Sequence, residues 1–292
     1  MSTLAADKSR RVLRHFAATR AAEVLALQAS PLLGIVLGGY RLDRDGAVPA
    51  GLLLLGSCAL TAHIFLFNDW AGWHSDLCDP RRASNAYDRR GVGRRDLARV
   101  ATALLILAGI AFAAVSVTAL LLGAAIAALG FLYSGSPALG KNMPIASSFN
   151  HLVGGTLHFL LGYTFVHAFD ANGVWTGLFF GLVFAAGHLN QEVRDYEGDK
   201  LNAIRTNAVV FGRRRAFFAS LFTFSAAYAM LTTLAALDVL PRLLLWSPAA
   251  WLLHVGWSLQ ALRRGLSFET AVWMQQRYRW LFALIGLAML AR

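Results

Sequence analysis

The chain has 292 residues, of which 57% are hydrophobic and only 15% are charged, and its mean hydropathy is +0.52. A soluble domain of this length carries more charge, so the composition predicts an integral membrane protein. The 27 Lys and Arg residues outnumber the 16 Asp and Glu residues. They lie in short segments between apolar stretches, which is typical of cytoplasmic loops and argues against a nucleic-acid-binding surface.

Nine apolar stretches predict transmembrane helices, of which the fourth must borrow residues from its neighbour and the last is short. Basic residues at 1–23 lead directly into the first stretch without a small-residue cleavage site, so we expect a cytoplasmic basic N-terminus and an uncleaved first span. The predicted spans are 24–40, 50–67, 98–120, 121–132, 145–165, 174–189, 216–237, 243–262 and 281–290.

The charges of the loops predict the orientation of these spans. If the N-terminus is cytoplasmic, every strongly basic loop lies on the cytoplasmic side, in agreement with the positive-inside rule. The loops on the opposite side carry few charges; one of them is the segment around Asp170. We therefore expect a multi-pass protein of the inner (plasma) membrane.

Two acidic segments stand out among the basic loops. One runs from Asn68 to Asp79 after the second predicted span, and the other runs from Glu192 to Lys200 after the sixth. Each follows the second helix of a four-helix set, which predicts an internal repeat. The expected fold is all-α and polytopic, with nine transmembrane helices in two four-helix pseudo-repeats plus one, around a central cavity where the two acidic segments could meet. We expect a single transmembrane domain over 1–292, with motif loops at 68–97 and 190–213.

The spacing within the acidic segments favours a divalent-metal site. Asp195 and Asp199 are four residues apart and so share one face of a helix, and Glu192 precedes Asp195 by three residues. Asn68 and Asp76 would lie two turns apart if the second helix continued to that point. These oxygen donors suit Mg²⁺, which keeps water ligands and bridges to phosphate, whereas zinc prefers softer ligands. An ordinary solvated charge is the alternative for any single Asp, but two clusters at repeat-related positions argue against it.

These motifs resemble those of the UbiA-type intramembrane prenyltransferases. The first motif of that family reads N-D-x-x-D-x-x-x-D, the second reads D-x-x-x-D followed by T-x-x-V-x-x-G, and a loop between them reads Y-S, six residues and K. This chain matches the three patterns at Asn68, Asp69, Asp76, Asp195, Asp199, Thr206, Val209, Gly212, Tyr133, Ser134 and Lys141.

The resemblance implies an Mg²⁺-dependent enzyme that moves a prenyl group from a prenyl diphosphate to a small-molecule acceptor, surrounded by membrane lipid. The implied Mg²⁺ ligands are Asn68, Asp69, Asp76, Glu192, Asp195 and Asp199. The expected diphosphate contacts are Arg81, Tyr133, Lys141, Arg194 and Lys200. Asp76, Asp195 and Lys141 are expected to be catalytic, because metals and cations stabilise the leaving diphosphate as the carbon–oxygen bond breaks. An electron-rich aromatic ring is the expected acceptor, since its substitution needs only a weak base.

One departure from the family pattern concerns the first motif. Gly72 stands where the family has its middle Asp, so water, Asp69 or Asp79 would have to replace that ligand. Two other functions remain open. A cyclase of the same fold would ionise the same donor and capture the cation with its own double bonds, and a transporter or lipid-binding protein would use the repeat without catalysis.

Overall fold

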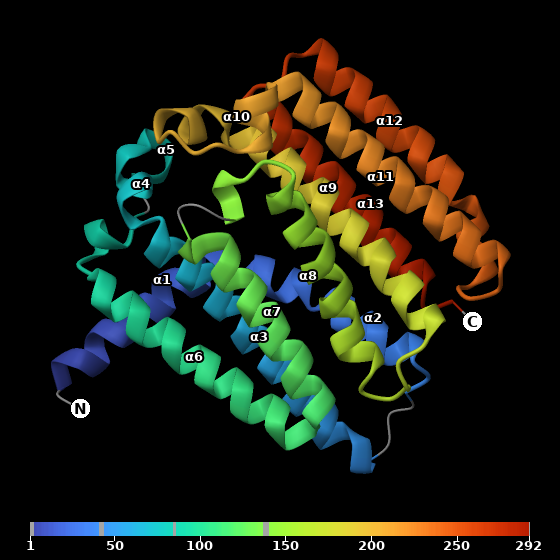
Figure 1. The fold of residues 1–292 in the computed structure, drawn as a ribbon, viewed down its shortest axis with the longest axis horizontal. Helices are drawn as coiled ribbons and strands as arrows, with labels where there is room; N and C mark the ends of the chain where they lie inside the picture. Colours follow the sequence, from blue (N-terminus) through green and yellow to red (C-terminus); the bar gives the residue numbers. More distant parts are fainter. Residues whose placement is uncertain (1–2, 41–43, 84–85, 137–139, 292) are drawn as a thin grey trace. The chain divides into compact units, whose positions relative to one another are not determined.

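The structure is a computed structural model that describes residues 3–40, 44–83, 86–136 and 140–291. Within these residues all regular structure is helical, which confirms the predicted all-α class (Figure 1). The chain divides into two compact units. Unit 1 consists of Met1–Leu32 and Arg41–Gly140, and unit 2 consists of Leu33–Tyr40 and Lys141–Arg292.

Unit 1 is built on α3, which packs against α6, α7 and α1. Figure 1 shows α6 and α7 running alongside α3. The helices from the N-terminus to the end of this unit are α1 (Thr3–Leu27), α2 (Ala29–Leu37, whose second half belongs to unit 2), α3 (Arg44–Ala71), α4 (Trp73–Cys78), α5 (Pro80–Ala83), η1 (Tyr87–Arg90), α6 (Arg94–Val115) and α7 (Val117–Gly135).

Unit 2 is built on the 31-residue helix α9, which packs against α8, α11, α10 and α13. In Figure 1, α8 and α11 flank α9. The helices that follow α7 are η2 (Gly140–Asn142), α8 (Ala146–Tyr163), α9 (Ala171–Leu201), α10 (Asn207–Phe211), α11 (Arg213–Ala236), η3 (Arg242–Trp246), α12 (Ser247–Arg263) and α13 (Phe268–Ala288).

Six helical segments of the described chain are long and apolar enough to cross a membrane. They are Asp7–Leu37, Gly46–Ala71, Arg94–Val115, Val117–Gly135, Ala171–Leu201 and Arg213–Ala236. All six overlap predicted spans, but the boundary between the third and fourth spans lies at Ser116 instead of residues 120 and 121. Ser116 has an extended backbone, and its side chain accepts a hydrogen bond from the amide of Ala119, so it caps α7.

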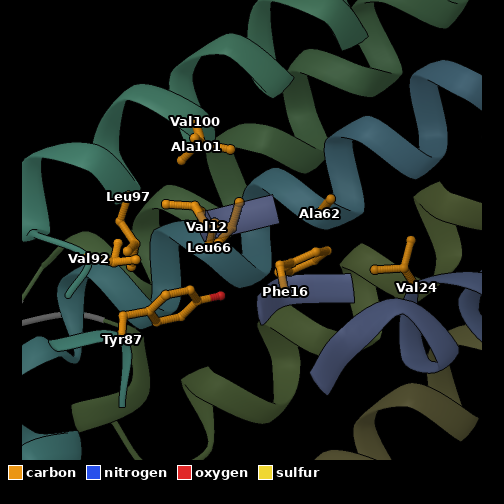
Figure 2. Packing of buried hydrophobic residues seen from close by; sticks show 10 residues of the cluster. All are labelled: Val12, Phe16, Val24, Ala62, Leu66, Tyr87, Val92, Leu97, Val100 and Ala101. Atoms are coloured by element: carbon orange, nitrogen blue, oxygen red, sulfur yellow. The ribbon is translucent and has the colours of Figure 1, made fainter. Parts of the chain in front are cut away.

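The basic N-terminal segment is helical and takes part in the core of unit 1. Val12, Phe16 and Val24 on one face of α1 are buried in a cluster with residues from α3, η1 and α6 (Figure 2). Arg11 and Arg14 on the opposite face are exposed. The segment is therefore an amphipathic helix, and its charges accompany a buried apolar face.

Close contact between α8 and α9 sets their register. A Cβ atom at Gly155 would lie 2.9 Å from the side chain of Phe184 and 3.0 Å from the Cα of Gly181. Because the two helices are antiparallel, pairs one turn further along also meet: the rings of His151 and His188 stack with centroids 3.8 Å apart. No sequence pattern predicts this pairing, since the two histidines lie in different helices.

We predict that Gly181→Ala destabilises unit 2, because the added methyl group would overlap the carbonyl of Leu152 and the hydroxyl of Thr156. Overpacking of this kind costs about 1–3 kcal/mol. Gly256→Ala in α12 is the matched control: no atom lies within 4 Å of the added Cβ, and alanine favours a helix by up to ~1 kcal/mol. Thermal unfolding in detergent should show a lower midpoint for the first variant only. Equal midpoints would contradict the close packing of α8 and α9.

Candidate active site

The first acidic motif follows a nearly continuous helical path. α3 continues past the predicted span to Ala71, and α4 begins at Trp73. Gly72 interrupts the helix with φ −81° and ψ 3°. Its amide donates to the carbonyl of Asn68 at 2.8 Å, and its carbonyl accepts from the amide of Asp76 at 2.9 Å. These two hydrogen bonds keep Asn68 and Asp76 two turns apart, as expected, although the helix is interrupted. A Cβ atom at Gly72 would lie 3.6 Å from Oδ2 of Asp76.

Asn68 and Asp69 contact different helices, because successive side chains on a helix point about 100° apart. Oδ1 of Asn68 accepts a hydrogen bond from the hydroxyl of Ser134 at 3.2 Å, which joins the first motif to the end of α7. Asp69 is largely buried, and its Oδ1 lies 3.6 Å from Nη2 of Arg20 on α1. Arg20 also pairs with Glu23 at 2.9 Å, so Asp69 and Glu23 share its positive charge.

Tyr87 and Arg94 pack against the end of α3, beside the first motif. Burial, together with the negative charge of Asp69, raises the pKa of Tyr87, so the phenol stays neutral. Arg94 donates from Nε to the backbone carbonyl of Trp70 at 3.2 Å, and its guanidinium carbon lies 4.4 Å from the centre of the Trp70 side-chain ring. Arg94 therefore supports the end of α3, where it satisfies a carbonyl left over by the helix.

The second acidic motif is helical, which corrects the prediction of a loop beginning at residue 190. α9 continues through Leu201 and is capped by Asn202. Asp195 and Asp199 lie one turn apart on its last turns, as the spacing predicted. Thr206 caps α10 through a hydrogen bond from the backbone amide of Val209 at 3.4 Å, which explains the Thr of the motif.

Arg194 holds the carboxylate of Asp195 in a bidentate ion pair. Its Nε and Nη2 atoms each donate to an oxygen of Asp195 at 2.8 Å. Its Nη1 donates to Oε1 of Gln275 on α13 at 2.9 Å, and Gln275 is buried. Gln275 carries no motif signature and lies 81 residues away in sequence, so sequence reasoning missed it.

Glu192 is more deeply buried than Asp195, with 3% of its side chain exposed. Oε1 accepts from Ser147 Oγ at 3.3 Å and from Asn207 Nδ2 at 3.1 Å. Oε2 accepts from the amide of Ala208 at 3.3 Å. The Nε2 atom of His188 lies 3.0 Å from Oε1. These contacts come from α8, α9 and α10, and all of them belong to unit 2.

The remaining predicted residues lie in both units. Tyr133 lies at the end of α7, Lys141 lies half-buried in η2, and Lys200 is exposed at the end of α9. Arg81 lies in α5, and its side chain is outside the described part of the structure. Among the described residues no group of three His, Cys, Asp or Glu side chains is placed to hold a metal ion. Helical spacing aligns Asn68 with Asp76 in unit 1 and Asp195 with Asp199 in unit 2.

Comparison with known proteins identifies the family. The model of the UbiA prenyltransferase family matches residues 32–289. The chain therefore belongs to the UbiA prenyltransferase family. No match was found among the curated proteins. The six apolar helices and the UbiA family together indicate an integral membrane protein.

Solved UbiA structures share the fold of this chain. A UbiA homologue from Archaeoglobus fulgidus bound to GPP and Mg²⁺ is 18% identical, with 98% of this chain and 100% of that chain covered and a TM-score of 0.70. A digeranylgeranylglyceryl phosphate synthase is 15% identical over 96% and 98% of the two chains, with a TM-score of 0.72. A UbiA homologue from Aeropyrum pernix K1 is 18% identical over 90% and 96%, with a TM-score of 0.71.

We predict that Arg194→Gln increases the affinity of the protein for Mn²⁺ in the absence of diphosphate. The substitution removes the cation that neutralises Asp195. A partly exposed ion pair is worth roughly 1 kcal/mol, so we expect about threefold to tenfold tighter binding by electron paramagnetic resonance. Arg215→Gln, which removes an exposed charge on α11, should leave the affinity unchanged. Equal affinities in all three proteins would show that Arg194 does not compete with the metal.

Proposed function

We propose that this UbiA-family chain is a membrane prenyltransferase that transfers a prenyl group from a prenyl diphosphate to a small-molecule acceptor. One observation carries the proposal: both acidic motifs lie on helix ends that keep their oxygen donors one or two turns apart. In the first motif these donors are Asn68 and Asp76, and in the second they are Asp195 and Asp199. The family match over residues 32–289 supports the same reaction class.

The donor set fits Mg²⁺. Each motif offers two oxygen side chains, and Mg²⁺ commonly completes its octahedral shell with water and phosphate oxygens. Bound Mg²⁺ would supply Lewis-acid stabilisation of the leaving diphosphate. We propose Asn68, Asp76, Asp195 and Asp199 as the ligands that this chemistry needs. Asp69 faces α1 from a different side of α3 than Asn68, so we give it a supporting role.

Cationic side chains would hold the diphosphate itself. Lys141 follows the end of α7, Arg194 lies beside Asp195, and Lys200 ends α9. We propose that these three groups, with Arg81 and Tyr133, bind the phosphate oxygens as negative charge develops on them. Asp76, Asp195 and Lys141 are the residues that we expect to be indispensable.

The arrangement in the membrane is also part of the proposal. We propose nine spans in two four-helix pseudo-repeats plus one, within a single transmembrane domain in the inner (plasma) membrane. The distribution of basic loops supports a cytoplasmic location for the N-terminus and both motifs. Each motif would then meet diphosphate at the cytoplasmic surface, while the prenyl chain lies among apolar side chains. An electron-rich aromatic compound is the acceptor class that we propose.

We expect purified protein in detergent to release diphosphate from GPP or a longer prenyl diphosphate only when Mg²⁺ is present. Asp195→Asn and Asp76→Asn should each lower the rate at least about 100-fold, because each removes a charged metal ligand. Lys8→Gln in the N-terminal helix is the control and should keep the full rate. Absence of release from every donor, with phenolic acceptors present, would refute the enzymatic proposal and favour transport or lipid binding.

Mass spectrometry of the product distinguishes the transferase from a cyclase. A prenylated phenol that forms only when an acceptor is added indicates transfer. A cyclic hydrocarbon or alcohol that forms equally well without an acceptor indicates cyclisation.

We predict that Gly72→Asp lowers the Mg²⁺ concentration needed for half-maximal diphosphate release. The new carboxylate would extend from a Cβ that lies 3.6 Å from Oδ2 of Asp76, and the backbone angles of Gly72 suit any residue. A third oxygen ligand should increase metal affinity by about tenfold. Gly72→Ala is the matched control for the added Cβ. An equal Mg²⁺ requirement in both variants would show that position 72 does not face the metal.

A further inference from the structure

Two segments of unit 2 are joined by hydrogen bonds beside the second acidic motif. The first consists of η2, which contains Lys141, and the residues that lead from η2 to α8. The second contains Arg205 and connects α9 to α10. Oδ1 of Asn142 accepts a hydrogen bond from the amide of Arg205 at 3.2 Å. Oδ1 of Asn207 accepts from the amide of Ile145 at 2.7 Å. The two loops therefore take up their conformations together.

Ile145 shows that this connection holds the backbone in an unfavourable conformation. Its φ is +67°, in the left-handed region that a β-branched residue rarely adopts. Such a conformation costs of order 1–3 kcal/mol and persists only where the surrounding contacts maintain it. The hydrogen bond to Asn207 is the contact made by the amide of this same residue.

Glu192 holds both loops in place through hydrogen bonds. Its carboxylate binds the Nδ2 atom of Asn207 and the amide of Ala208, which fixes the start of α10, and the hydroxyl of Ser147, which fixes the start of α8. Binding to Nδ2 also orients the Asn207 side chain so that its Oδ1 atom faces Ile145. Both carboxylate oxygens are thus occupied by donors in a site with 3% exposure.

A carboxylate in this state is poorly suited to bind Mg²⁺. The ion would have to displace several hydrogen bonds at once, and the groups left behind would be buried without acceptors, at about 1–3 kcal/mol each. Asp199, about two turns further along α9 and half-buried, has no such burial to overcome.

We infer that Glu192 is a positioning residue for diphosphate binding and not a metal ligand. Through Asn207 and Ala208 it fixes the two loops so that Lys141 and Arg205 present their cations together to the phosphate groups. The inference rests on the proposed function, because it assigns a diphosphate to this part of unit 2. Arg205 is exposed, so its side chain can reach a ligand.

The test compares Glu192→Gln with Asn207→Ala and Asn142→Ala. Asn142 is half-exposed, so its variant should fold even if the two buried substitutions do not. Hydrogen exchange measured by mass spectrometry should be at least about tenfold faster in the peptides that contain Ile145 and Ala208 in the first two variants. The segment around Arg205 should exchange faster in Asn142→Ala.

Ligand binding then separates positioning from metal coordination. Calorimetry with inorganic pyrophosphate and saturating Mg²⁺ should show at least fivefold weaker binding in all three variants. Mn²⁺ binding without pyrophosphate should stay within twofold of wild type. Asp199→Asn is the control for a metal ligand and should weaken Mn²⁺ binding.

Two results would overturn the inference. One is loss of Mn²⁺ affinity in Glu192→Gln but not in Asn207→Ala, which would identify Glu192 as a ligand. The other is an unchanged affinity for pyrophosphate in Asn142→Ala and also in Glu192→Gln or Asn207→Ala, wherever these variants fold and show faster hydrogen exchange. If wild-type protein binds no pyrophosphate and turns over no prenyl diphosphate, the proposed function is itself wrong. That outcome differs from both of the others, in which wild-type protein binds normally.

Discussion

A buried carboxylate must be compensated by hydrogen-bond donors, and in unit 2 this requirement organises the end of α9. Most backbone amides of a helix are already used within it, so Glu192 has to find donors elsewhere. It obtains them from Ser147 at the start of α8 and from Asn207 and Ala208 at the start of α10. Three helix ends are thereby joined at one side chain. The ordered loops beside the second motif depend on this junction.

The acidic motifs lie on helix ends, and this gives them a fixed geometry. α3 and α9 both extend past their apolar segments, so the side chains of each motif are separated by known helical steps. Neighbouring residues consequently face different surroundings. Asn68 contacts Ser134 on α7 while Asp69 faces Arg20 on α1, and in α9 Arg194 lies against Asp195. Adjacent residues of one motif therefore bind different side chains, although the motif lists them as one series of polar residues.

The sequence was informative where short-range physics decides the structure. A run of about 20 apolar residues has few alternatives to a helix, so the overlap of predicted spans with helices such as α3 and α11 was foreseeable. The exact ends of the helices were harder to predict. The break at Ser116 depends on one capping side chain within a continuous apolar run. Residues 190–201 continue α9 although they are polar, because Gln, Glu, Arg and Lys are good helix formers. Residue spacing also indicated the two acidic motifs, because that spacing is set by the chemistry of the site, and the family followed from the resemblance of these motifs to known ones.

The sequence by itself determined the all-helical membrane class, the position of the two acidic motifs and the membership of the UbiA prenyltransferase family. The tertiary structure alone decided which acidic side chains have protein partners. Arg20 reaches Asp69, Gln275 reaches Arg194, and Asn207 reaches Glu192. The last of these contacts joins residues only 15 positions apart, whereas the other two join distant helices. In each case the partner is fixed by how helices pack and where their ends meet, and a linear pattern of residue types carries no record of that arrangement.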